Sequence, residues 1–142
     1  MNQITTIPDK ISNLTCLEEF TIGNNKISEL PGEICSLTNL KELSVFSNQI
    51  AKLPDCISNM IKLEELVLSQ NLLTKIPDSI GVLHNLSTFT VNNNQLTSIP
   101  HSLCNLTLKT CWVHNNPNLE LDTTITNWLS ELTRLGSDVR FL

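Results

Sequence analysis

Two cysteines and two histidines lie close together near the end of the chain, and these are the side chains that a zinc ion prefers. They occur as His101-x-x-Cys104 and Cys111-x-x-His114, with six residues between the two motifs. A strand through the second pair would turn its two side chains to opposite faces, because an offset of three residues is odd. One ion cannot collect ligands at about 2.0–2.3 Å from both faces. We therefore expect no metal site in this stretch.

Patterns typical of catalytic sites are not found in the sequence. It has no glycine-rich phosphate loop, no nucleophile elbow, and no histidine placed beside a carboxylate at a useful spacing. We accordingly predict that the protein is not an enzyme and that it uses no cofactor.

Composition narrows the choice of partner. The 142 residues carry 9 basic and 14 acidic side chains, a net charge of −5. Nucleic acids and anionic membranes are bound through basic surfaces, so both are disfavoured as partners. The sequence holds no apolar run long enough to cross a membrane, and its first twenty residues do not read as a signal peptide. With 40% hydrophobic residues, the chain suits a single domain with an adequate core.

The main signal is a repeat with a fixed period of 23 residues. Prolines recur at this step, and so do asparagines; the positions are Pro8, Pro31, Pro54, Pro77 and Pro100, and Asn2, Asn25, Asn48, Asn71 and Asn94. A period between 20 and 50 residues is typical of solenoids and propellers, in which each repeat packs on its neighbours.

One unit shows the pattern clearly. Residues 63–73 follow L-x-x-L-x-L-x-x-N-x-L, and residues 76–83 follow I-P-x-x-I-x-x-L. These motifs resemble the leucine-rich repeat family, in its 23-residue, Ras-group-like form, over residues 2 to about 121. The resemblance implies an α/β fold, a right-handed curved horseshoe fragment with a parallel sheet on its concave side.

Equivalent positions in successive repeats, here called columns, lead to the same architecture on physical grounds. Apolar residues alternate with exposed ones through Leu66 and Leu68, which indicates a short strand with one buried face. The asparagine that follows, Asn71 in this unit, can satisfy backbone groups where the chain leaves the strand. After the proline, apolar residues three apart favour a 3₁₀ turn. Because a turn is wider than a strand, we expect the stack to curve with its strands inside.

We predict one domain over residues 1–142. A half repeat covers 1–7, full repeats start at the five prolines, and the fifth repeat is one residue short near Leu106. A helix over about 122–135 is expected to cap the end, with Asp122 or Thr123 at its start and Gly136 at its stop. The N-terminal edge is left uncovered, so we predict that either a longer natural chain covers it or two copies associate there.

The five cysteines are expected to be free thiols. Cys35 and Cys104 share a column but lie three repeats apart, which at about 4.8 Å per strand exceeds the reach of a disulfide. Reduced thiols favour a cytoplasmic protein, or one that acts in a host cytosol after secretion. Three glycosylation sequons coincide with the repeat pattern and are interpreted as chance.

The fold and composition together predict a protein–protein interaction module, such as a scaffold, an adaptor, a regulator in signalling or a pathogen effector. The alternative is an extracellular recognition receptor for glycans or microbial ligands. Fold alone does not decide between them.

Outward strand residues give the candidate binding face. On the concave side we predict that a partner with a basic and apolar surface contacts Glu19, Glu42, Phe46, Glu65, Val67, Thr90, Asn92, Trp112 and His114. Phe46 and Trp112 are the expected anchors, because outward aromatic side chains there have no core to pack against and such residues are enriched at binding hot spots.

Overall fold

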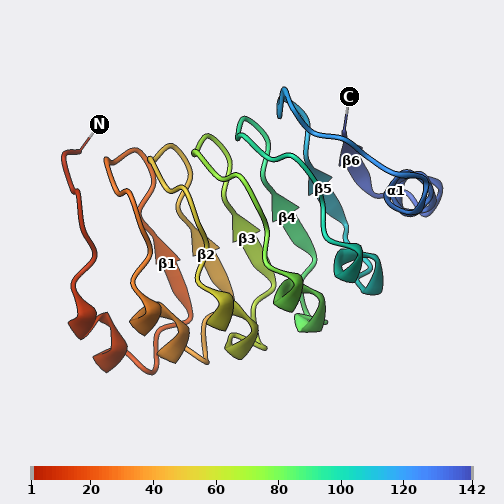
Figure 1. Ribbon diagram of the computed structural model, residues 1–142. Helices are drawn as coiled ribbons and strands as arrows, with labels where there is room; N and C mark the ends of the chain where they lie inside the picture. Colours follow the sequence, from red (N-terminus) through yellow and green to blue (C-terminus); the bar gives the residue numbers. More distant parts are fainter. Residues whose placement is uncertain (1, 142) are drawn as a thin grey trace.

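The computed structural model describes residues 2–141 and forms a single parallel sheet of six strands in chain order. The strands are β1 (Glu19–Thr21), β2 (Glu42–Ser44), β3 (Glu65–Val67), β4 (Thr88–Thr90), β5 (Thr110–Trp112) and β6 (Asp138–Arg140). Successive turns of the chain stack side by side, so every strand pairs with the strand of the next turn (Figure 1). The α/β leucine-rich repeat architecture predicted from the sequence is confirmed.

Short 3₁₀ helices return the chain from one strand to the next. They are η1 (Asp9–Asn13), η2 (Gly32–Ser36), η3 (Asp55–Asn59), η4 (Asp78–Val82) and η5 (His101–Asn105). Each begins directly after one of the periodic prolines, whose φ lies between −64° and −71° with an extended ψ. Proline prefers this φ, and its carbonyl accepts the first bond of the turn, as Pro54 does from the Ile57 N–H at 3.1 Å.

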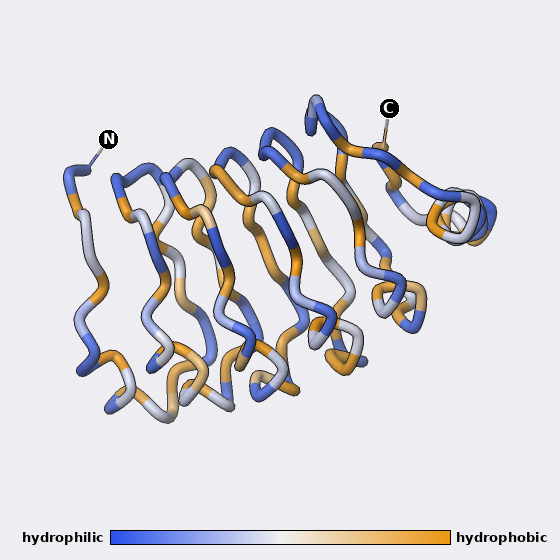
Figure 2. The backbone as a smooth tube through the Cα atoms, viewed as in Figure 1, coloured by the Kyte–Doolittle hydropathy of each residue, from blue (hydrophilic) through white to orange (hydrophobic). Residues whose placement is uncertain are grey.

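The core lies between the sheet and these turns. Inward strand residues are fully buried, among them Leu43, Leu66, Phe89 and Cys111. In the first turn the equivalent residue Phe20 is only partly buried, because no further strand stacks beside β1 within residues 2–141. Hydrophobic segments recur at the same place in successive turns (Figure 2).

The asparagine column is a ladder of buried hydrogen bonds, as predicted. The Asn71 Oδ1 accepts from the Ile50 N–H at 3.0 Å, and its Nδ2 donates to the carbonyls of Val45 and Leu68 at 3.1 Å each. Each amide therefore ties its own turn to the preceding one. The same bonds recur at Asn48, Asn94 and Asn116.

A backbone feature beside the ladder was not predicted. The residue before each ladder asparagine has a positive φ of 53° to 58°; these residues are Asn24, Ser47, Gln70, Asn93 and Asn115. Left-handed backbone is unfavourable for most side chains and is best tolerated by glycine and asparagine. The sharp exit from every strand thus depends on the amide that follows it to hold this conformation.

The shortened fifth repeat loses its local turn. The C-cap residues after η1 to η4 have ψ between 49° and 65°, whereas Leu106 after η5 is extended with ψ 143°. The deletion is absorbed there, and β5 still pairs with β4 in register.

The C-terminal cap is confirmed as a helix, α1 (Thr123–Arg134). The Asp122 side chain accepts from the Ile125 N–H, and Gly136 follows the helix with φ 90°. Ile125, Leu129 and Leu132 are buried. Trp128 is partly buried against the core, and its Nε1–H donates to the Leu106 carbonyl at 3.1 Å.

Strand β6 was missed by the sequence analysis. It follows α1 directly and adds a sixth rung to the sheet, with Val139 beside Cys111 and Arg140 beside Trp112. Its three residues come after the repeat pattern has faded, so no periodic signal marks them.

The expectation of five free cysteines is wrong for one pair. Cys35 and Cys56 form a disulfide with their Cα atoms 5.8 Å apart, and Cys16, Cys104 and Cys111 are free. The spacing of the repeat excluded a bond only between Cys35 and Cys104, which occupy the same position of their repeats. The bonded cysteines occupy different positions of adjacent turns, the fourth residue of η2 and the second of η3, where the turns are in contact. This disulfide removes the reason to favour a reducing compartment.

Within residues 2–141, no helix is long and apolar enough to cross a membrane.

Replacing Asn71 by alanine should destabilise the protein by ~1–3 kcal/mol, because the change leaves buried backbone groups of two turns without partners. Denaturant unfolding followed by circular dichroism measures this loss. The exposed Asn59, at the end of η3, provides a matched control, and Asn59→Ala should change the midpoint little. Equal midpoints for the two variants would contradict the role of the ladder.

A thiol reagent should find three free thiols in the denatured, unreduced protein and five after reduction. In the native protein Cys111 should not react, because burial raises the pKa of its thiol to about 12 and keeps it protonated. The exposed Cys16 should react readily. Five free thiols without reductant would show that the Cys35–Cys56 bond is absent.

Candidate functional site

The sheet face turned away from the core, here called the concave face, contains a shallow hollow of about 500 Å³. It spans β2 to β5 and is lined by Phe46, Val67, Ser69, Gln70, Thr88, Thr90, Asn92, Thr110 and Trp112. Five of the residues predicted to contact a partner meet there: Phe46, Val67, Thr90, Asn92 and Trp112. The hollow is therefore apolar at its two ends and hydroxyl-rich between them.

Phe46 occupies one end and lies directly over Gly23 of the neighbouring turn. A Cβ atom at Gly23 would come within 2.3 Å of the Phe46 ring. The absence of a side chain at Gly23 thus makes room for the ring, which stays partly exposed. This contact was not predicted, although Gly23 stands in the same column as Phe46.

Trp112 occupies the other end, and it is not without partners as the sequence suggested. Its Nε1–H donates to the Asp138 Oδ2 at 3.0 Å, and the Arg140 guanidinium lies 4.2 Å from its ring centre. The Arg140 Nε–H also donates to the Asp138 Oδ1 at 3.2 Å. These bonds to Arg140 and Trp112 hold the pKa of the Asp138 carboxyl below its usual range. Strand β6 accordingly fixes one wall of the hollow.

The floor of the hollow is polar and internally bonded. The Ser69 hydroxyl is hydrogen-bonded to Asn92 Oδ1 at 2.6 Å and to Thr90 Oγ1 at 3.0 Å. Thr90 and Asn92 are less than a tenth exposed. Because they are buried, Thr90 and Asn92 provide little area that a partner could contact. The main surface available in the hollow is therefore that of Phe46, Val67 and Trp112.

The three glutamates lie beside the hollow without lining it. Glu19, Glu42 and Glu65 are register neighbours on β1, β2 and β3. The ion pairs formed among residues 2–141 do not include them; the pair near them joins Lys41 to Glu18 at 2.6 Å. A row of unpaired negative charge therefore borders the hollow on the side of β1.

His114 does not belong to this hollow. It lines a second one, of about 450 Å³, with Asn116, Leu121 and Phe141, and its Nδ1 is buried without a hydrogen-bond partner. Its ring centre lies 6.4 Å from that of Trp112. The prediction that a partner contacts His114 together with the residues of the first hollow stays a prediction.

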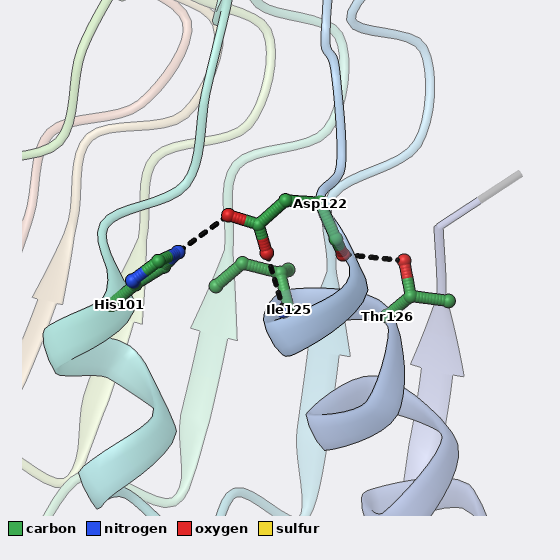
Figure 3. A network of polar contacts seen from close by, with 4 residues as sticks. All are labelled: His101, Asp122, Ile125 and Thr126. Atoms are coloured by element: carbon green, nitrogen blue, oxygen red, sulfur yellow. Dashed lines mark hydrogen bonds and ion pairs between the residues drawn. The ribbon is translucent and has the colours of Figure 1, made fainter.

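A histidine–carboxylate pair, which the sequence analysis did not find, joins η5 to α1. The His101 Nε2 lies 2.5 Å from the Asp122 Oδ2, while the Asp122 Oδ1 caps the helix through the Ile125 N–H at 3.0 Å (Figure 3). The two residues are 21 positions apart and meet because adjacent turns stack. These bonds, first to Ile125 and then to His101, hold the pKa of Asp122 below its usual range.

This pair does not make a nucleophilic site of Cys104. Burial and the Asp122 charge raise the pKa of the Cys104 thiol, so it stays protonated near neutral pH. Within residues 2–141, no group of three or more His, Cys, Asp or Glu side chains is placed to hold a metal ion. The arrangement functions as a helix cap.

Family models match most of the chain. Residues 1–72 match the model described as a leucine-rich repeat region, and residues 62–83 and 85–106 match the model of the leucine-rich repeat itself. No curated protein matches this sequence.

Solved structures share the fold. A leucine-rich repeat protein of Leptospira interrogans is 30% identical with a TM-score of 0.87, over 99% of this chain and 35% of that protein. The ectodomain of the receptor kinase SOBIR1 from Arabidopsis thaliana is 29% identical with a TM-score of 0.70, over 80% of this chain and 64% of that one. An internalin of Listeria monocytogenes, at 22% identity and a TM-score of 0.75, covers 99% of this chain and 47% of its own and shows the fold alone. The chain thus spans about a third to two thirds of these proteins.

Replacing Asp122 by asparagine should remove a pH dependence of stability while keeping the helix cap. Asparagine caps a helix about as well as aspartate but does not titrate. Since the folded state lowers the pKa of Asp122, the carboxylate stabilises the protein above about pH 4, and this contribution is lost as the pH falls.

Thermal melts at several pH values measure the effect. The melting temperature of the parent should exceed that of Asp122→Asn near neutral pH and approach it in acid. Asp122→Ala, which cannot cap, should be less stable at every pH. A constant difference between parent and asparagine variant would contradict the ionic role of Asp122.

Proposed function

This chain belongs to the leucine-rich repeat family, whose fold generally mediates protein–protein interactions, and we propose that it is a protein-binding module that receives its partner on the concave face. The observation that carries the proposal is the hollow between Phe46 and Trp112, two partly exposed aromatic side chains on a face that packs against no core. Tryptophan is among the residues most enriched where binding energy concentrates.

The partner we propose is a protein that presents basic and apolar groups. Phe46, Val67 and Trp112 supply apolar contact, Thr90 and Asn92 shape the floor between them, and the glutamates of β1 to β3 favour positive charge. We leave His114 out of the primary contact surface, because it lines a different hollow. In a cytosol such a module would act as a scaffold, an adaptor or a regulator in signalling, or as an effector in a host.

The second candidate is a module of an extracellular recognition receptor. The Cys35–Cys56 disulfide favours it, since disulfides persist in oxidising compartments. The plant receptor kinase GASSHO1/SCHENGEN3, whose ectodomain was solved in complex with Casparian strip integrity factor 2, shares the fold with a TM-score of 0.80 at 23% identity, over 96% of this chain and 19% of its own. The thiol count proposed above separates the two settings.

Self-association through the first turn stays a prediction. Leu14 there is 50% exposed, while its equivalent Leu37 in the next turn is fully buried. That surface can accept a further repeat or a second copy equally well.

Truncating either aromatic anchor should weaken partner capture. Proteins retained from a lysate by the immobilised parent chain are identified by mass spectrometry, and their retention is compared on the Phe46→Ala and Trp112→Ala variants. Each change should reduce affinity by ~2 kcal/mol or more, about thirtyfold. Phe46→Ala is the cleaner test, because Trp112 also anchors β6.

Ile61→Ala is the matched control, because Ile61 is 58% exposed and lies just after η3, on the side of the 3₁₀ turns, here called the return side. It removes exposed apolar surface without touching the concave face and should leave capture unchanged. Loss of partners with Ile61→Ala and their retention with both concave variants would show that the proposed face is wrong.

A further inference from the structure

We propose that the hollow receives an extended basic segment of the partner, with one large apolar side chain in the hollow and arginine or lysine at the second and fourth residues away from it. This inference rests on the proposed function and specifies the chemistry of the partner.

The charge on the concave face is one-sided. Glu19, Glu42 and Glu65 stack across neighbouring strands about 4.8 Å apart, and like charges directly opposite each other destabilise a sheet. Some exposed acids form ion pairs, as Glu18 does with Lys41 and Glu131 does with Arg134, whereas others such as Glu29 and Glu33 form none. Among residues 2–141, the three stacked glutamates form no ion pair and also lie directly beside one another. A cationic ligand would relieve this repulsion, so charge complementarity selects a basic partner.

The acidic row and the apolar hollow are contiguous. Glu65 is in register with Thr88, which lines the hollow, and it stands two residues before Val67 on the same strand face. Arg140, which lies against the Trp112 ring at the wall of the hollow, is hydrogen-bonded to Asp138. It leaves the charge of the glutamates uncompensated. One ligand segment can therefore reach both surfaces.

The strand spacing sets the pattern of the ligand. The hollow extends from Phe46, just after β2, to Trp112 on β5, so its middle lies near the junction of β3 and β4. That junction is one and a half strand spacings, about 7 Å, from β2 and about 12 Å from β1. A segment that crosses the strands in an extended conformation advances about 3.4 Å per residue, with alternate side chains on one face. Residues two and four positions from the anchor then lie about 7 and 14 Å away in this direction, over β2 and β1, the strands that carry Glu42 and Glu19. This match predicts the alternating basic pattern.

Short synthetic peptides test this pattern directly. The first probe is a serine–glycine peptide with blocked termini that carries one leucine and two arginines, two and four positions from the leucine. It is made in two versions, with the arginines either before or after the leucine in the chain. Three related peptides replace both arginines by glutamate, both arginines by serine, or the leucine by serine. Binding to the isotopically labelled 142-residue chain is followed by NMR through the backbone amides of β2 to β5 and the indole N–H of Trp112.

We expect one direction of the arginine–leucine peptide to bind at least about tenfold more tightly than each related peptide, with the difference shrinking as salt is added. Glu19→Lys combined with Glu42→Lys should reverse the preference in favour of the glutamate peptide. A matched pair of changes away from the concave face, Glu29→Lys with Glu33→Lys, should leave the preference unaltered. This reciprocal exchange would identify charge recognition at these residues.

Two outcomes overturn the inference and leave the proposed function intact. Equal affinity of the serine–leucine and arginine–leucine peptides at the concave face would show that charge does not select the partner. Absence of binding by all peptides, combined with a captured partner that Phe46→Ala releases, would show that the partner is not an extended segment of this kind.

A third outcome would contradict both the inference and the proposed function. In it, the peptides shift only resonances on the return side, and partner capture survives Phe46→Ala.

Discussion

The buried amide of the ladder asparagine is the interaction on which the rest of the structure depends. It satisfies backbone groups of its own turn and of the preceding one, as Asn71 does for Ile50, Val45 and Leu68. By holding each left-handed exit from a strand, it keeps the turns in register. Only in that register do the outward residues of separate turns become neighbours on one face. The hollow between Phe46 and Trp112 is a product of this alignment, since its lining comes from four successive turns of the chain.

The periodic part of the structure was predictable because each column has one physical role. Strand positions, the buried ladder and the prolines before the 3₁₀ turns follow from repeated residue types, and the capping helix follows from its own helical spacing of apolar residues and its capping residues. Departures from the period were not predictable in the same way. Strand β6 has no repeat to mark it, and the disulfide joins different columns of adjacent turns.

The candidate site was predicted in its position more than in its contacts. Alternation along the strands located Phe46, Val67 and Trp112 on the concave face, and the structure brings them to one hollow. Their surroundings depend on residues outside the pattern. Gly23 leaves space under Phe46, and Asp138 and Arg140 hold Trp112. His114 was predicted on the concave face with them; in the structure it lines a neighbouring hollow, with its ring centre 6.4 Å from that of Trp112.

Strand β6 links the proposed contact surface on the concave face to the C-terminal cap of the stack. In many modular designs an end cap is exchangeable, because it serves only to shield the last repeat from water. Here the strand that follows the cap helix donates Asp138 and Arg140 to a wall of the hollow, through Trp112. Transplanting these repeats onto a foreign cap would preserve every repeat residue and still change the chemistry of the face they present. The proposed contact surface therefore depends on residues beyond the last repeat, as far as Arg140 in β6.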